Sequence, residues 1–205
     1  MTNDVISAFL QLAVLGVVAF FIYFLWQKRF RRRTFREVAQ RAGLQFCEWR
    51  YLAYSLAFAL IGVVAIVAWS PPLELFTRPG SAQRQFVGLG FSPLAIVKAF
   101  LYGAVQTGLT EELIFRGMIA GSLSRHLPFM WANLAQAFIF FLPHLLILQF
   151  APELWGLLPL VFLGALVFGW LRIKSGSIIP SWLMHASGNM AMALSVAART
   201  AGIDA

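Results

Sequence analysis

Residues 5–26 read VISAFLQLAVLGVVAFFIYFLW, and the basic run QKRFRRR at residues 27–33 follows them directly. The hydrocarbon core of a bilayer is about 30 Å thick, so a helix needs roughly 20 predominantly apolar residues to cross it. A cleaved signal peptide carries its positive charges before the apolar stretch, whereas here they come after it. Residues 5–26 therefore predict a helix that anchors the chain in a membrane.

The rest of the chain is similarly apolar. Of its 205 residues, 60% are hydrophobic and 12% are charged, and its mean hydropathy is +0.77. A soluble domain is closer to half apolar and about a quarter charged. Five further segments are long and apolar enough to cross a bilayer: 51–69, 93–123, 128–150, 154–171 and 177–198. We therefore predict an all-α, polytopic transmembrane bundle of about six helices.

This bundle is expected to form a single membrane domain over residues 1–205. Residues 1–92 would supply the N-terminal transmembrane helices and a basic loop, and residues 93–198 would supply the helices that carry polar groups. The 93–123 segment is long and holds charges, so a tilt or a break is expected near residues 108–110.

Much of the net charge of +8 comes from one run after the first apolar segment. Its basic residues are Lys28, Arg29, Arg31, Arg32, Arg33, Arg36 and Arg41. Basic residues beside a membrane helix usually mark the cytoplasmic side and contact anionic lipid headgroups. The N-terminus is therefore predicted to lie outside, although Arg199 and two arginines in the 70–92 loop run against the rule. FREVAQRAGLQF, at 35–46, is expected to form an interfacial helix.

The same composition disfavours nucleic acid as a partner and disfavours thiol redox chemistry. No aromatic platform or nucleic-acid-binding motif accompanies the basic run, which argues against nucleic acid as a partner. Cys47 is the single cysteine, so the chain cannot form an intrachain disulfide, and no thiol pair indicates redox chemistry. Membrane lipids are the partners that this composition predicts.

Three charges in residues 110–117, TEELIFRG, lie inside an apolar segment. A charge at the centre of a membrane helix costs about 2.5–3.5 kcal/mol on insertion scales, so such residues are candidates for function. Glu112 and Arg116 are four residues apart, share one helix face and can neutralise each other. Glu111 is rotated by about 100° from that face, which leaves its carboxylate available.

Two other apolar segments carry isolated polar groups, His144 in FFLPHLL and His185 with Asn189 in MHASGNM. On the predicted topology, Glu111 and His185 lie at similar depths, roughly 15 Å above the cytoplasmic helix ends at 1.5 Å per residue. His144 lies somewhat deeper. A carboxylate can act as a general base, an imidazole can hold a water, and a His/Asn pair can donate hydrogen bonds to an oxyanion. Together these groups suit the hydrolysis of an amide.

Other polar and small residues have simpler explanations. Lys98 is expected to extend from the outer helix end towards the headgroups. His126 lies in a turn without an evident partner. Gly117 and Gly121 in GMIAG match the small-xxx-small spacing of closely packed helices, and a lone His144 could equally be a hydrogen-bonding packing residue.

Three of these stretches resemble the motifs of a known family. EELIFR at 111–116 resembles EExxxR, FFLPH at 140–144 resembles FxxxH, and HASGN at 185–189 resembles HxxxN. They occur in this order on three hydrophobic segments in the C-terminal half. On these motifs the chain resembles the CAAX-protease and bacteriocin-processing (Abi) family. The first 90 residues carry no such motif.

The resemblance implies an intramembrane glutamate protease of the Rce1 type that needs no metal or other cofactor. Glu111 would activate a water together with His144. His185 and Asn189 would form the oxyanion hole. The implied substrates are prenylated proteins that end in CAAX or other small membrane-associated peptides. Bacterial relatives are linked to peptide processing and bacteriocin immunity, so a prokaryotic cell membrane is the expected location.

The resemblance also gives Glu112 and Arg116 a supporting role, in agreement with the ion pair expected from their spacing. Two alternatives stay open. One carboxylate and two imidazoles also form a known catalytic zinc set, although no HExxH motif is present and Asn189 has no evident role as a ligand. The fold could also serve a non-enzymatic immunity protein or membrane scaffold that binds a peptide. The sequence names neither the substrate nor the oligomeric state.

Overall fold

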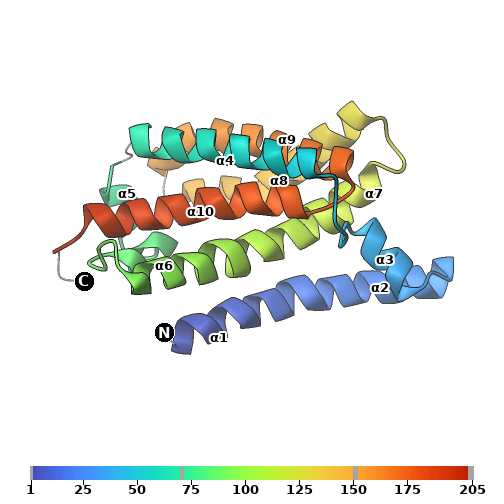
Figure 1. Cartoon of the computed structure of the whole chain (residues 1–205), viewed down its shortest axis with the longest axis horizontal. Helices are drawn as coiled ribbons and strands as arrows, with labels where there is room; N and C mark the ends of the chain where they lie inside the picture. The colour runs from blue at the N-terminus through green and yellow to red at the C-terminus, as the bar shows by residue number, and fades with distance from the viewer. Residues whose placement is uncertain (1, 70–71, 150–151, 203–205) are drawn as a thin grey trace.

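The computed structural model describes residues 2–69, 72–149 and 152–202. Within these ranges the regular elements are helices and there are no strands, so the predicted all-α fold is confirmed (Figure 1). The first predicted span is one continuous helix, formed by α1 (Thr2–Gln11), the wide π-helical turns of η1 (Leu12–Val17), and α2 (Val18–Arg31). It ends where Arg32 adopts a left-handed conformation with φ of 52°.

The basic loop carries α3 (Phe35–Arg41), which is shorter than the interfacial helix expected over 35–46. α4 (Trp49–Trp69) follows it. Two short elements, α5 (Glu74–Thr77) and η2 (Ala82–Phe86), then lead to the helix that carries the acidic motif.

That helix runs from residue 93 to residue 123 without interruption. Ser92 caps its start by accepting a hydrogen bond from the amide of Ala95 at 3.2 Å. Its parts are α6 (Pro93–Phe100), η3 (Leu101–Leu109), η4 (Glu112–Ala120) and α7 (Gly121–Leu123). The break expected near residues 108–110 is absent, since the π-helical winding of η3 gives way there to two α-helical residues, 110 and 111. Gly108 allows this winding, because a Cβ at that position would lie 2.5 Å from the Gly103 carbonyl oxygen.

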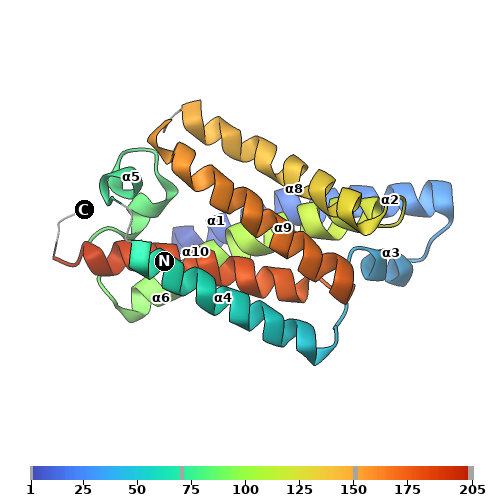
Figure 2. The same cartoon turned by 90° about the horizontal axis from the view of Figure 1, so that it is seen from above.

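The remaining elements complete the C-terminal half. They are α8 (Phe129–Leu145), η5 (Leu146–Gln149), η6 (Pro152–Leu157), α9 (Leu158–Ser175) and α10 (Ile179–Arg199). Helix α10 lies at the centre of the bundle and contacts α4, α9, α6 and η3. Figure 1 shows α4 and α9 on one side of α10 and the 93–123 helix on the other, with α1 and α2 outermost. In Figure 2, α8 and α9 run side by side, in agreement with their contacts.

Three stretches of the described residues are long and apolar enough to cross a membrane, at Thr2–Arg31, Trp49–Trp69 and Pro152–Ser175. Helix α8 is a shorter apolar helix. The protein is therefore a polytopic integral membrane protein. The predicted spans 93–123 and 177–198 are helical but do not belong to the three, so the count of six spans stays a prediction.

The GMIAG stretch packs closely, as its spacing predicts, but its partner is the end of α3. A Cβ at Gly117 would lie 3.0 Å from the carbonyl oxygen of Ala42, and one at Gly121 would lie 2.8 Å from that of Arg41. The two glycines thus let the backbone of the basic loop approach the 93–123 helix. This contact holds α3 against one end of the bundle.

Candidate active site

Three helices supply the candidate residues. Glu111 lies between η3 and η4 on the 93–123 helix, and His144 lies in the last turn of α8. His185 and Asn189 are one turn apart on α10, the central helix. The arrangement of their side chains depends on Glu112, the neighbour of Glu111, which is fully buried.

Glu112 and Arg116 form the ion pair that their spacing predicts. Nη1 of Arg116 is 3.3 Å from Oε1 of Glu112, and neither side chain is exposed. The guanidinium group lies over the ring of Phe140 at 4.0 Å and over that of Phe168 at 4.9 Å. Aromatic faces attract a cation, most strongly where water is excluded. The pair thus keeps two opposite charges together inside an aromatic enclosure.

Glu112 also orients His185. Its Oε1 is 3.0 Å from Nδ1 of His185, and because a carboxylate only accepts hydrogen bonds, Nδ1 carries the proton. The imidazole stacks on Phe168 with ring centroids 5.0 Å apart and an interplanar angle of 17°. With one nitrogen bonded and one face covered, His185 has a defined orientation. Its Nε2 lies 3.8 Å from Oε2 of Glu111.

Glu111 differs from its neighbour in exposure. Its side chain is 29% exposed, whereas that of Glu112 is fully buried. The 3.8 Å between Glu111 and Nε2 of His185 is longer than a hydrogen bond. The carboxylate is therefore near an imidazole without being bonded to it, and its oxygen atoms remain available to another molecule.

His144 has a separate set of contacts. Its Nδ1 is 2.9 Å from the carbonyl oxygen of Phe140, so Nδ1 donates, and Nε2 has no hydrogen-bond partner among the described residues. The Phe140 ring is 4.6 Å from the His144 ring and 6.1 Å from the His185 ring. Among the described residues, the imidazole within 4 Å of Glu111 is that of His185. The partnership of Glu111 with His144 stays a prediction.

Asn189 is anchored to the neighbouring helix. Its Nδ2 donates to Oγ1 of Thr107 at 2.8 Å, and Thr107 donates in turn to the carbonyl oxygen of Tyr102 at 2.9 Å. An amide nitrogen has two hydrogens, so the second remains available as a donor. Gly103 permits this closeness, because a Cβ there would lie 2.9 Å from the backbone nitrogen of Met190 and 3.1 Å from Cβ of Asn189.

Two residues of this site were missed by sequence reasoning. Thr107 precedes Glu111 by four residues in the same helix, and its hydroxyl in an apolar segment is the signal that could have identified it. Phe168 offers no such signal, because a phenylalanine in an apolar helix is usually a packing residue. Its role becomes visible only from its contacts with Arg116 and His185.

An apolar cavity is lined by residues of the 93–123 helix, of α10 and of the chain segments before α4 and α10. Its volume is about 480 Å³, and its lining includes Leu109 and Trp182, which lie two residues before Glu111 and three before His185. The other lining residues are Gly43, Leu44, Gln45, Phe46, Ile178 and Ile179. Across the described residues, no group of three or more His, Cys, Asp or Glu side chains is arranged to hold a metal ion.

Comparison with known proteins identifies one related family. Residues 92–191 match the family model described as type II CAAX prenyl endopeptidase Rce1-like. The matched region begins just before α6 and extends into α10, so it contains the acidic motif, both histidines and Asn189. No match was found among the curated proteins or among the solved structures.

Proposed function

We propose, because residues 92–191 match the Rce1-like family of type II CAAX prenyl endopeptidases, that the protein is an intramembrane endopeptidase of this family whose catalytic base is Glu111. The family implies a protease that acts in a membrane on a prenylated peptide or protein. The observation that carries the assignment of the base is the contrast between the two glutamates. Glu112 is buried and paired with Arg116 and His185 through Oε1, whereas Glu111 is partly exposed beside an oriented imidazole.

The proposed reaction is the hydrolysis of an amide by an activated water. Glu111 accepts a proton from the water while the water oxygen bonds to the scissile carbonyl carbon. The carbonyl oxygen then carries the negative charge, and Nε2–H of His185 and Nδ2–H of Asn189 donate hydrogen bonds to it. Glu111 returns the proton to the leaving nitrogen as the C–N bond breaks. One water is consumed, and an acid and an amine are released.

His185 must be protonated on both nitrogens to donate from Nε2. Its Nδ1 faces Glu112 at 3.0 Å and its Nε2 faces Glu111 at 3.8 Å. Glu112 and Arg116 thus act as positioning residues, as Glu112 holds Nδ1 and Arg116 pairs with Glu112. For His144, the free Nε2 suits a hydrogen bond to the attacking water.

The apolar cavity supports a lipidated or strongly apolar substrate. Its residues Leu109 and Trp182 lie on the helices that carry Glu111 and His185, a few positions away from them. Burial of a hydrocarbon chain contributes about 0.8 kcal/mol per CH₂ group. A prenyl group in this cavity would hold the adjoining peptide close to the proposed base.

The test is cleavage of a prenylated reporter peptide by the purified full-length protein in detergent. Glu111→Gln keeps the shape of the side chain and removes the base, so the protein should stay folded. Because general-base catalysis contributes about 10²–10⁴-fold, we expect the cleavage rate to fall at least 100-fold. Glu48→Gln is the matched control, because Glu48 is an exposed glutamate paired with Arg50, and it should cleave at the parental rate. Full activity of Glu111→Gln would refute the assignment.

A chelator separates this mechanism from a zinc enzyme and from a scaffold. If Glu111 activates the water, a strong chelator should leave the rate unchanged. Reagents that modify serine or cysteine should also leave it unchanged. Loss of activity on chelation, with recovery on addition of zinc, would instead support a zinc site at the histidines. Absence of cleavage of any prenylated or unmodified membrane peptide would favour a peptide-binding scaffold.

A further inference from the structure

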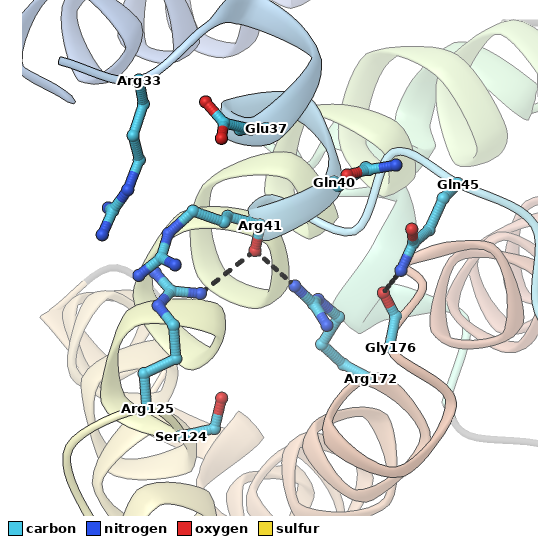
Figure 3. Close-up of a pocket in the computed structure, with 9 residues that line it drawn as sticks. All are labelled: Arg33, Glu37, Gln40, Arg41, Gln45, Ser124, Arg125, Arg172 and Gly176. Carbon is cyan, nitrogen blue, oxygen red and sulfur yellow. Dashed lines mark hydrogen bonds between the residues drawn. The ribbon is translucent and has the colours of Figure 1, made fainter. Parts of the chain in front are cut away.

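A second cavity lies at the basic end of the bundle. It has a volume of about 480 Å³ and is formed by α3 with its adjoining loop, the turn after α7, and the end of α9. Its lining residues, drawn in Figure 3, are Arg33, Glu37, Gln40, Arg41, Gln45, Ser124, Arg125, Arg172 and Gly176. The proposed proteolytic reaction uses none of them.

The charges of this cavity are strongly unbalanced. Four arginines line it together with a single carboxylate, that of Glu37. That carboxylate already accepts hydrogen bonds from the backbone nitrogen and the hydroxyl of Thr34, at 2.7 and 2.9 Å. Three positive charges of the lining therefore have no counter-charge within it.

One backbone carbonyl holds two of the arginines in place. The carbonyl oxygen of Arg41 accepts hydrogen bonds from Nη2 of Arg172 at 2.8 Å and from Nη1 of Arg125 at 3.3 Å (Figure 3). Burial lowers the pKa of the Arg125 guanidinium, and the positive charges of Arg41 and Arg33 lower it as well. The guanidinium groups thus repel one another, which a bound anion would relieve.

The hydrogen-bonding capacity of the arginines is also incomplete. Nε of Arg41, of Arg125 and of Arg172 is buried and has no partner among the described residues. Arg172 itself is only 5% exposed. A buried donor without a partner is costly and in native proteins usually marks an ion or a water that completes it.

Two glycines make room for this arrangement. A Cβ at Gly43, where φ is +76°, would lie 2.7 Å from Nε of Arg172, and one at Gly121 would lie 2.9 Å from its Nη2. The cavity is therefore built by close packing of the loop and two helix ends around Arg172. It differs in this respect from a scatter of flexible surface arginines.

We propose that this cavity binds a phosphate group, supplied by the headgroup of an anionic phospholipid. Guanidinium groups match phosphate oxygens with paired, charge-assisted hydrogen bonds. The location fits a headgroup, because α2 and α9 both end here in basic last turns that contain Lys28, Arg29, Arg31, Arg172 and Lys174. Basic pockets between membrane helices are sites of this kind. Free inorganic phosphate is the other source of the same group.

Native mass spectrometry of the full-length protein in detergent tests the proposal by counting bound phosphatidylglycerol, with phosphatidylcholine as the neutral comparison. We expect one phosphatidylglycerol to bind at least tenfold more tightly than phosphatidylcholine. Arg41→Gln should reduce that affinity at least tenfold. Arg36→Gln is the matched control, because Arg36 is an exposed arginine of the same helix outside the cavity, and it should bind within about twofold of the parent.

Arg33→Gln serves as a second variant if Arg41→Gln does not fold, because Arg33 donates its hydrogen bond to the side chain of Gln27. Competition by millimolar inorganic phosphate would support the phosphate site and identify a soluble source, whereas resistance to it would support the lipid. Equal losses in Arg36→Gln and the cavity variants would overturn the proposal, since they would reflect only the basic surface. Equal binding of the two lipids would overturn it as well.

Discussion

Arg116 connects the aromatic and the polar parts of the candidate site. Its guanidinium group lies between the rings of Phe140 and Phe168 and pairs with Glu112, which in turn accepts the hydrogen bond from His185. Loss of one partner of a buried pair leaves the other charge without compensation, typically at a cost of 3–5 kcal/mol. The stability of the protein and the orientation of His185 therefore depend on the same residue.

We expect Arg116→Ala to lower the free energy of unfolding by about 3–5 kcal/mol and to reduce the yield of folded protein. Arg50→Ala is the control, because it removes an ion pair with Glu48 in which both side chains are more than half exposed. Such exposed pairs contribute about 0–1 kcal/mol. Thermal unfolding in detergent measures both changes. Normal accumulation and full activity of Arg116→Ala would show that the ion pair is dispensable.

At the scale of elements, the contact between η3 and α10 brings Asn189 to Thr107. Gly103 sets this distance, because its missing side chain lets the two backbones approach. The corresponding contact at the other end of the 93–123 helix is made by Gly117 and Gly121 with the end of α3. Glycines on one helix thus position both a catalytic candidate and the basic loop.

Gly103→Ala should force η3 and α10 apart, since the new Cβ would meet backbone atoms of α10. Overpacking of this kind typically costs about 1–3 kcal/mol, and we expect cleavage of the reporter peptide to fall with stability. Gly188→Ala is the matched control on α10, because no atom lies within 4 Å of the Cβ it would add. It should be neutral or stabilising, given the higher helix propensity of alanine. Equal behaviour of the two variants in unfolding and cleavage assays would contradict the close contact.

The capping of α3 predicts a dependence on pH. Hydrogen bonds from the backbone and the hydroxyl of Thr34 lower the pKa of Glu37 below its usual 4.5. A lowered carboxyl pKa contributes stability above the unfolded value, and this contribution is lost as the pH falls through the folded pKa. Hydrogen exchange should therefore show α3 losing protection as the pH falls below about 4.5. Glu37→Gln should abolish this dependence, and a parental pH profile in that variant would assign the effect to another group.

At the scale of the whole molecule, opposite ends carry different chemistry. One end holds the arginine cavity and the α2–α3 loop, and the other holds Lys98, whose Nζ is 3.5 Å from Oδ1 of Asp4 and 3.3 Å from the carbonyl oxygen of Gln85. Lys98 thus has specific partners in addition to the headgroup contact that the sequence suggests. α1 begins and α10 ends at this second end (Figure 1). An even number of crossings, as predicted, would produce that arrangement.

The predicted orientation places the arginine end in the cytoplasm. Cys47, the single cysteine, lies in the basic loop, so a membrane-impermeant maleimide should label it only after the cells are permeabilised. Burial raises the pKa of its thiol, which makes a labelling pH of about 8 preferable, since the thiolate is the reactive form. Cys47→Ser with Gln85→Cys is the matched control at the opposite end and should react in intact cells. The reverse pattern would invert the topology.

The sequence by itself determined the fold class, because a long apolar run admits few structures other than a membrane helix. It also singled out the six polar residues, since charged and polar groups in apolar segments are costly and rare. The pairing of Glu112 with Arg116 followed from their spacing, because residues four apart meet on one helix face. These features depend on composition and on the geometry of a single helix.

Only the tertiary structure decided which groups meet between helices. The hydrogen bond from His185 to Glu112, the stacking of His185 on Phe168 and the bond from Asn189 to Thr107 all join separate elements. The arginine cavity likewise combines three parts of the chain. Such contacts depend on how each helix is rotated and how closely it approaches its neighbour, and spacing along one helix does not encode either quantity.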